Sequence, residues 1–346
     1  MTSQEDEVAD VVVVGSGPSG SVVTHTLAAR GFKVVCLEQG DWVSPADYPA
    51  NYPEWELLIQ KQWAHDPNER RLPADFPMEV SDSDMWPVMF NAVGGSSIFY
   101  GAEWPRLLPS DFRVRTLDGV CDNWPITYAD LAPYNDRIDA FIGVSGLGGD
   151  PAYPEGLDYP LPPHPLGKAG REAAEGMNAL GWHWWPGTNA IPSQKFKELS
   201  QCARWGTCEW GCPESSKASS DIAFWPHALR SGATLVTGAR VRKIETGRDG
   251  QATGALWIDR DGAEHRQRGS CRRRLCQRHR NTAATAAVGV GAASGRSGEL
   301  LRSCRQKPDA PELLGDRLLR REPRELAGPG RPSDPFHGVL RDSRRA

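Results

Sequence analysis

Glycines at a fixed spacing near the start of the chain have the pattern of a phosphate-binding turn. They belong to a stretch that directly follows the apolar run 11–14 and reads Gly15-Ser16-Gly17-Pro18-Ser19-Gly20. In such a turn the first glycine permits the tight bend, the second lets a pyrophosphate approach the backbone, and the third lets a helix pack closely on a strand. The N-terminus of that helix supplies N–H donors and partial positive charge. The pattern predicts a dinucleotide-binding turn, although an ordinary glycine turn contains the same residues.

An acidic residue follows at the distance that such a site requires. Glu38 lies 18 residues beyond Gly20, at the end of the second expected strand. There its carboxylate is able to accept hydrogen bonds from both ribose hydroxyls of a dinucleotide. An acid at this position also repels a 2′-phosphate, which argues against NADP. The motif alone does not decide between FAD and NAD.

A second cluster of small residues, Gly94-Gly95-Ser96-Ser97, occurs about sixty positions later. Successive glycines followed by two hydroxyls could form a further anion-binding turn or let a flat cofactor ring lie against the backbone. Taken alone, the cluster is equally compatible with a plain loop.

The expected elements place these motifs in a doubly wound α/β fold. The run 11–14 is a short β-branched strand, the glycine turn opens a helix that ends at Gly31, and 32–37 forms the next strand. Helical spacing recurs over 129–141 and 169–180, and strands are expected over 182–185, 234–245 and 252–259, the last two joined at Asp249-Gly250.

Composition excludes several classes of protein. A chain of 346 residues is long enough for two domains. It has no apolar run approaching the roughly 18 residues of a membrane span, and its acidic start MTSQEDEVAD is not a signal peptide. Eight cysteines in such a chain suggest reduced thiols and a cytoplasmic location. Charge is split, with 19 basic and 8 acidic residues in 266–346 against 21 basic and 36 acidic residues before them.

Several motifs in order resemble the glucose-methanol-choline (GMC) oxidoreductases. They extend over about residues 8–265 and lie in the expected FAD-binding domain, residues 1–265, which has interleaved α+β substrate-domain segments. The motifs are Val11–Gly20 with Glu38-Gln39-Gly40, Asn91 to Ser97, Trp104-Pro105-Arg106, Pro109 to Phe112, Trp124-Pro125-Ile126 and Gly238 to Val241. The resemblance implies an incomplete Rossmann-like FAD-binding fold. It places Gly15, Ser16, Gly17, Pro18, Ser19 and Gly20 at the pyrophosphate and Glu38 with Gln39 at the ribose. It also places Asn91, Gly94, Gly95, Ser96 and Ser97 near the flavin, and the backbone of Val241 beside the adenine.

The resemblance also implies the reaction, which is oxidation of an alcohol or sugar-like small molecule by hydride transfer to flavin. The electron acceptor stays open between oxygen, a quinone and a protein. Some members attach FAD covalently through a His shortly after the double glycine. Here that stretch is Ile98-Phe99-Tyr100, so we expect non-covalent FAD. The family's catalytic His lies near the C-terminus of a much longer chain, so we expect no catalytic residue here, weak FAD binding and little turnover.

Three cysteines, Cys202, Cys208 and Cys212 before Pro213, approach the spacing of a ferredoxin cluster, but Trp205 occupies the second ligand position. The alternatives are an iron–sulfur cluster in an electron-transfer protein, a zinc site, and a structural cysteine-rich loop. Some members of the resembling family have a similar loop before an Ala-Lys-x-Ser stretch, here Lys217 to Ser220. The structural loop is therefore the favoured interpretation, with no metal.

The Arg-rich segment 266–346 differs in kind from the rest of the chain. Its clustered arginines could neutralise the phosphates of a nucleic acid or bind another acidic surface, but it lacks aromatic interleaving and any recognised module, which argues against nucleic acid. Our hypothesis is that the chain leaves its ancestral reading frame near 266–271. We then expect a disordered basic tail, because isolated charges cannot replace buried strands.

Overall fold

The structure is a computed structural model, and it describes residues 8–72, 75, 78–82, 89–248 and 250–269. The expectations for residues 270–346 lie outside the described residues.

A three-stranded parallel sheet forms the centre of the fold. β1 (Val11–Val14) pairs with β2 (Val34–Leu37), and β2 pairs with β3 (Thr234–Val236), in the order β1-β2-β3. Every residue of β2 is buried, as expected of a central strand covered on both faces. α1 (Pro18–Ala28) connects β1 to β2. The predicted strand, turn, helix and strand are therefore confirmed.

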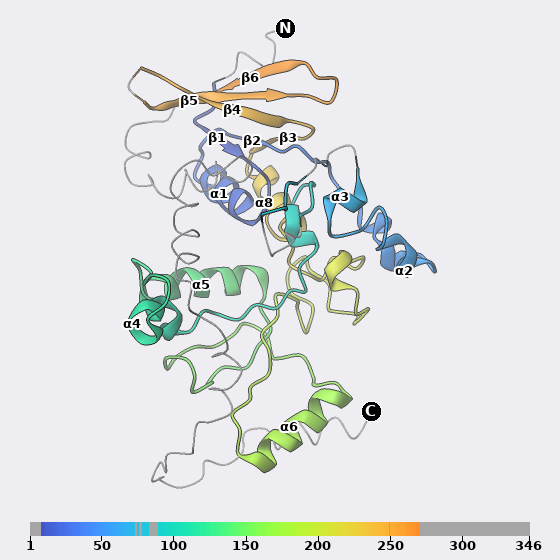
Figure 1. Cartoon of the computed structure of the whole chain (residues 1–346), viewed down its shortest axis with the longest axis vertical. Coiled ribbons are helices and arrows are strands. Elements are labelled where there is room, and N and C mark those ends of the chain that lie inside the picture. The colour runs from blue at the N-terminus through green and yellow to red at the C-terminus, as the bar shows by residue number, and fades with distance from the viewer. Residues whose placement is uncertain (1–7, 73–74, 76–77, 83–88, 249, 270–346) are drawn as a thin grey trace.

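Different layers cover the two faces of this sheet (Figure 1). Alternate residues of a strand point to opposite faces, and β2 shows this directly. Val34 and Cys36 join a buried cluster with α1 and α8 (Trp225–Arg230). Val35 and Leu37 join a cluster with the second sheet. The result is a layer of helices, a parallel sheet and an antiparallel sheet.

The second sheet is antiparallel, with the order β4-β5-β6. Its strands are β4 (Arg240–Thr246), β5 (Ala252–Ile258) and β6 (Glu264–Arg268). The predicted hairpin between the first two is confirmed. β6 crosses the expected domain boundary at 265. After β6 the chain reaches β1, where the N–H of Ala9 donates to the carbonyl oxygen of Arg268 at 3.1 Å.

The single strand predicted over 234–245 is wrong, because this stretch contributes β3 to one sheet and β4 to the other. Gly238 separates them with a φ of +67°, a left-handed conformation that interrupts a strand and that glycine adopts without steric cost. The backbone turns there, which allows one stretch of sequence to serve two layers.

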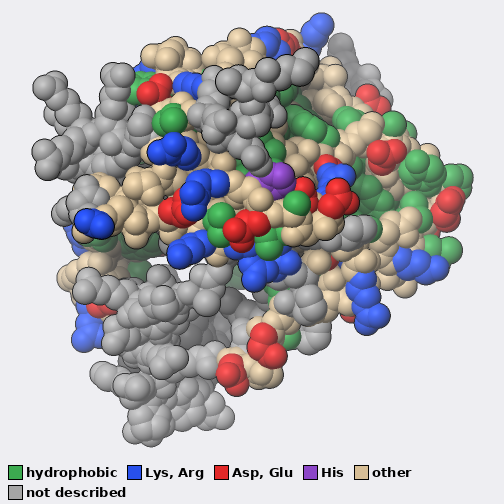
Figure 2. All heavy atoms as spheres, turned by 90° about the horizontal axis from the view of Figure 1, so that it is seen from above, with side chains coloured by type: hydrophobic (Ala, Val, Ile, Leu, Met, Phe, Trp, Pro, Cys, Tyr) green, Lys and Arg blue, Asp and Glu red, His purple; other side chains and the backbone are tan. Residues whose placement is uncertain are grey.

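The outer face of the antiparallel sheet is a solvated surface of mixed charge. Figure 2, which views the molecule from this side, shows Lys and Arg side chains spread over it with Asp and Glu between them. Arg266 is ion-paired with Glu245 at 2.7 Å, and Lys243 is exposed. This alternation of sign is typical of an ordinary exposed sheet face.

Between β2 and β3 the chain forms helices and long connections. The predicted helices 129–141 and 169–180 are confirmed as α5 (Tyr128–Ile142) and α6 (Lys168–Leu180). Both end at a left-handed glycine, Gly143 and Gly181. The short helices are α2 (Trp55–Leu58), α3 (Pro67–Arg70), α4 (Val114–Asp118), α7 (Ser220–Ala223) and the 3₁₀ turns η2 (Pro45–Asp47), η3 (Pro49–Asn51), η4 (Gly95–Ile98), η5 (Pro109–Arg113) and η6 (Cys208–Trp210). Among the described residues, no helix has the length and apolarity to cross a membrane.

The strand predicted over 182–185 is wrong, because no partner strand lies beside it in the described residues. Its tryptophans find other partners. Trp184 Nε1 donates to Asn178 Oδ1 on α6, and Trp185 Nε1 donates to the carbonyl oxygen of Leu147, each at 2.8 Å. Aromatic residues favour strands only where a pleated neighbour is available.

A buried ion pair anchors α5 to the segment that follows the second glycine cluster. Arg106 Nη2 lies 2.5 Å from Asp139 Oδ2, and both side chains are almost fully buried. Trp104 Nε1 donates to the other carboxylate oxygen at 2.9 Å. A charge-assisted pair with its remaining acceptor satisfied resists separation, because breaking it leaves an uncompensated buried charge. The Trp-Pro-Arg motif therefore has a structural role.

Candidate functional site

The first glycine turn joins β1 to α1 and is held from two sides. Gly15 has a φ of +88°, and its N–H donates to the carbonyl oxygen of Leu37 at 2.8 Å. A Cβ at Gly20 would overlap the carbonyl oxygen of Gly15, so glycine is needed for this close packing. Ser16 is fully buried. Trp225 Nε1 of α8 donates to its carbonyl oxygen at 2.8 Å.

The N-terminus of α1 has the features of an anion site. Gly17 is its extended N-cap and Pro18 its first helical residue, and in this described stretch no side chain caps the helix and no acid occupies its first turn. First-turn N–H groups have no acceptor inside a helix. Those of Ser19 and Gly20 are therefore available to a phosphate.

Glu38 is a buried carboxylate that fastens the end of β2 to the first turn. Its Oε2 accepts from the N–H of Ser16 at 2.8 Å and from the hydroxyl of Ser16 at 2.6 Å. Its Oε1 accepts from the N–H of Gly40 at 2.8 Å. A carboxylate has about four acceptor positions, so one position on Oε1 remains. This geometry accommodates one ribose hydroxyl without rearrangement, whereas the sequence led us to expect two.

The second glycine turn lies directly against the first. Gly94 has a φ of +96° and Gly95 a φ of +57°. The N–H of Gly94 donates to Ser16 Oγ at 3.3 Å. A Cβ at Gly95 would lie 3.3 Å from the Cα of Gly17. Two motifs that are far apart in the sequence therefore border one site, and Ser16 bonds to both Glu38 and the second turn.

The two serines of the second turn have different surroundings. Ser97 is buried, donating to the carbonyl oxygen of Gly94 at 2.6 Å and accepting from the N–H of Ser220 at 2.9 Å. Ser96 is exposed, and its Oγ accepts from the N–H of Phe90 at 3.2 Å. The hydroxyl of Ser97 therefore shapes the turn from inside.

Asn91 and Gln39 link the second turn to the end of β2. Gln39 Nε2 donates to Asn91 Oδ1, and Asn91 Nδ2 donates to Asp75 Oδ1 at 3.0 Å. Asp75 is ion-paired with Arg70 at 2.6 Å, and both of these side chains are buried. The amide of Asn91 is thereby fixed at both ends.

Val241 lies on β4, close in the chain to residues that contact Glu38. The N–H of Ala239 donates to the carbonyl oxygen of Glu38 at 2.8 Å, and that of Gly238 to the carbonyl oxygen of Gly40 at 3.3 Å. Val241 itself is half-buried and pairs with Trp257 on β5. The start of β4 is thus fixed beside the acidic residue.

The segment 217–221 also contacts the second turn, which the sequence analysis did not predict. The N–H of Asp221 would lie 2.9 Å from a Cβ at Gly94, and Tyr48 donates its hydroxyl to Asp221 Oδ2 at 3.4 Å. Burial raises the pKa of the Asp221 carboxyl. Lys217 is fully buried, and this burial lowers its pKa to about 8. The sequence signal that could have indicated this contact is a lysine between a cysteine-rich loop and a run of small residues.

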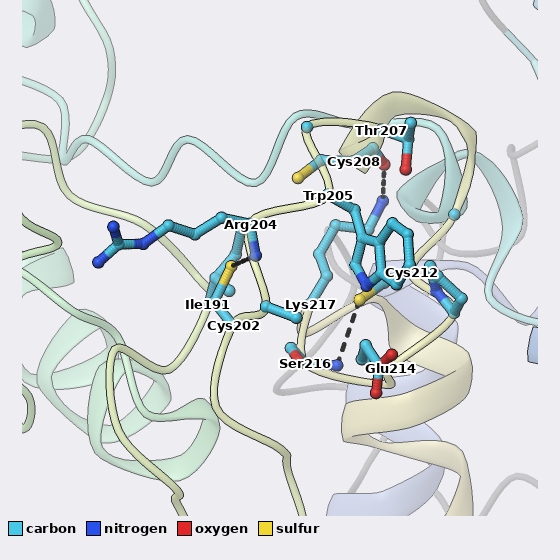
Figure 3. A pocket seen from close by; sticks show the side chains of 14 residues that line it. Ile191, Cys202, Arg204, Trp205, Thr207, Cys208, Cys212, Glu214, Ser216 and Lys217 are labelled. Carbon is cyan, nitrogen blue, oxygen red and sulfur yellow. Dashed lines mark hydrogen bonds between the residues drawn. The ribbon is translucent and has the colours of Figure 1, made fainter. Parts of the chain in front are cut away.

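The cysteines line an open pocket. Figure 3 shows Cys202, Cys208 and Cys212 at different parts of its wall, beside Lys217. All three are free thiols. Their sulfurs have local partners, since Cys202 accepts from the N–H of Arg204 at 3.4 Å and Cys212 from that of Ser216 at 3.3 Å. Burial raises the pKa of the Cys208 thiol. Within the described ranges, no three His, Cys, Asp or Glu side chains converge as metal ligands.

Comparison with known proteins decides the family. The GMC oxidoreductase family model matches residues 163–302, and a model of NAD(P)-binding Rossmann-like domains matches residues 13–69. A 2-methyl-1,2-propanediol dehydrogenase of Mycolicibacterium austroafricanum is 45% identical over 271 residues, which cover 77% of this chain and 48% of that protein. The chain belongs to the GMC oxidoreductase family. Membership confirms the expected Rossmann-like fold and FAD as the cofactor of the family, and it gives no support to an electron-transfer protein or a nucleic-acid-binding module.

Other GMC relatives differ in what their names say they act on. A 6‴-hydroxyparomomycin C oxidase of Streptomyces lividus is 30% identical, and the match covers 76% of this chain and 47% of that protein. The large subunit of a fructose dehydrogenase of Gluconobacter japonicus is 27% identical, with coverage of 76% and 51%. The chain spans about half the length of the curated relatives it matches.

Proposed function

We propose that the described residues form the FAD-binding part of an enzyme that oxidises alcohol groups. The observation that carries this proposal is the close approach of the two glycine turns, in which Ser16 is bonded to Glu38 on one side and to Gly94 on the other, and a Cβ at Gly95 would lie 3.3 Å from the Cα of Gly17. These contacts gather a helix N-terminus, a ribose-binding acid and a glycine-lined turn, which are the parts that a dinucleotide cofactor needs.

Each group of proposed site residues is assigned to one part of the cofactor. The first turn, with Gly15, Ser16, Gly17, Pro18, Ser19 and Gly20, binds the pyrophosphate. Glu38 accepts from a ribose hydroxyl, and Gln39 supports it through its contact with Asn91. The backbone of Val241 borders the adenine. The second turn, with Asn91, Gly94, Gly95, Ser96 and Ser97, lies toward the flavin. The binding is non-covalent, because Ile98-Phe99-Tyr100 follows that turn.

When bound, FAD supplies a hydride acceptor for the alcohol carbon. The residues of this site bind and orient the cofactor, and we propose none of them as a catalytic base. We propose a small alcohol or a sugar-like molecule as the substrate class, in keeping with the propanediol, hydroxyparomomycin C and fructose in the names of the relatives.

The test is direct binding of FAD to the purified full chain. We expect added FAD to bind the chain in a fluorescence titration, and no comparable binding of NADP. Ser19→Asp places a negative charge in the first turn of α1 and should weaken FAD binding at least tenfold. Ser110→Asp, at an exposed serine of η5, serves as the matched control. Equal FAD affinity of the Ser19→Asp variant and the unmodified chain would refute the pyrophosphate assignment.

A further inference from the structure

A fully buried lysine, Lys217, lies behind the second glycine turn, and all of its N–H donors bond to backbone carbonyl oxygens. Its Nζ donates to the carbonyl oxygens of Ile98 at 2.6 Å, Tyr100 at 2.9 Å and Cys208 at 2.6 Å. An ammonium has three N–H donors, so the group is saturated by these contacts. It is therefore not available to a ligand or a substrate, and its contribution is made through the segments that it joins.

The buried ammonium of Lys217 is hydrogen-bonded to carbonyl groups and, in the described part of the chain, not to a carboxylate. The side chain has no exposed surface, and within the described residues none of its three acceptors is a carboxylate. Burying a charge is costly unless hydrogen bonds replace its hydration. Three peptide carbonyl dipoles supply that replacement here, and Nζ also lies over the ring of Tyr100, 5.0 Å from the ring centroid, in a cation–π contact.

The three carbonyls belong to two separate parts of the site. Ile98 and Tyr100 lie in the segment that leaves the second glycine turn, whereas Cys208 belongs to the cysteine loop. Figure 3 shows the side chain of Lys217 extending from its own segment toward Cys208. The lysine is thus a link between the turn and the loop.

Neighbours of Lys217 fasten the same turn at further points. The N–H of Ser220 donates to Ser97 Oγ at 2.9 Å, and Tyr100 donates its hydroxyl to the carbonyl oxygen of Ala218 at 3.1 Å. Asp221 packs against Gly94. The stretch 217–221 therefore determines the course of residues 94–100, although it lies more than a hundred positions away in the sequence.

We propose that Lys217 is a positioning residue of the cofactor site. Its ammonium fixes the backbone of residues 98–100, and with it the second glycine turn, and it couples that turn to the cysteine loop at Cys208. The inference rests on the proposed function, because the turn matters for FAD only if the cofactor lies against it.

The experiment compares Lys217→Met and Lys217→Gln with a matched control, Lys197→Met, in the full chain. Lys197 also donates to two backbone carbonyls, those of Ala140 and Phe141, but it is exposed. Far-UV circular dichroism reports folding, and FAD fluorescence gives the Kd for FAD. Visible circular dichroism of bound FAD reports the environment of the flavin ring. The rate at which a disulfide reagent modifies Cys202, Cys208 and Cys212, followed on their own peptides by mass spectrometry, reports the cysteine loop separately from the exposed Cys121.

We expect both Lys217 variants to fold, to bind FAD at least tenfold more weakly with an altered visible dichroism, and to expose the loop thiols to modification several-fold faster. Lys197→Met should stay within twofold in Kd and in thiol reactivity. Folded Lys217 variants with unchanged Kd, dichroism and thiol reactivity would overturn the inference.

Two further outcomes remain informative. If the Lys217 variants do not fold, hydrogen exchange of the unmodified chain replaces them. FAD should then protect residues 206–210 together with 94–100, and protection confined to 94–100 overturns the coupling. If neither the unmodified chain nor Lys197→Met binds FAD, the proposed function fails instead.

Discussion

Replacing Glu38 by glutamine tests the centre of the site. The carboxylate accepts three hydrogen bonds, from the N–H and hydroxyl of Ser16 and from the N–H of Gly40. An amide offers a single acceptor oxygen, so at least one buried donor loses its partner, which costs about 1–3 kcal/mol. The remaining bonds also lose their charge assistance. We therefore expect Glu38→Gln to lower the free energy of unfolding by about 2–4 kcal/mol.

The same change removes the acceptor position that we assign to the ribose. Loss of one charge-assisted hydrogen bond is worth about 1.5–3 kcal/mol, which corresponds to a Kd for FAD raised by about tenfold to a hundredfold. Urea denaturation and FAD fluorescence titration measure the two effects. Glu175→Gln, at an exposed position of α6, is the control. A Glu38→Gln protein within about 0.5 kcal/mol in stability and twofold in Kd would show that this carboxylate neither fastens the turn nor binds the cofactor.

Three further predictions concern the elements around the first turn. Gly20→Ala should destabilise the protein by about 3 kcal/mol in urea unfolding, because its Cβ overlaps the carbonyl oxygen of the turn, whereas Gly176→Ala in the open face of α6 should be neutral or stabilising. Trp225→Phe keeps the aromatic packing but removes the N–H donor to the first turn, so we expect a loss of about 1–2 kcal/mol, and an unchanged urea midpoint would argue against that hydrogen bond. Burial lowers the pKa values of His25 and His227 at the interface of α1 and α8, so their protons bind more readily to the unfolded chain; stability should be complete above about pH 6.5 and fall as the pH drops below it. Urea midpoints measured between pH 7.5 and 5.5 should show this slope, and His227→Asn should reduce it.

Local signals were sufficient for the elements whose ends are set by their own residues. The glycines of the first turn and the β-branched residues of β1 and β2 indicated a strand, turn, helix and strand without reference to the rest of the chain. α5 and α6 end at Gly143 and Gly181 because a left-handed residue terminates a helix locally. The residues that determine these features lie within about one helical turn of them in the sequence.

Features that depend on distant partners were not predictable in this way. The pattern over 234–245 indicated a strand, but assignment of its halves to different sheets required the positions of β2 and β5. The buried roles of Lys217 and Asp221 depend on carbonyls and a glycine that lie more than a hundred positions earlier. The two glycine turns and Glu38, which the motifs indicated, lie together. No spacing in the sequence indicated that Trp225 and Asp221 contact these turns.

The late arrival of β3 has a consequence for how the protein folds during synthesis. β2 ends at Leu37, and its second neighbour begins at Thr234. At about 5–20 residues per second, a ribosome needs roughly 10–40 seconds to make the intervening chain. Throughout that interval the edge of β2 that will bind β3 has no native partner and is able to pair with other exposed strands. We expect the nascent chain to depend on chaperones until residues 234–236 have emerged.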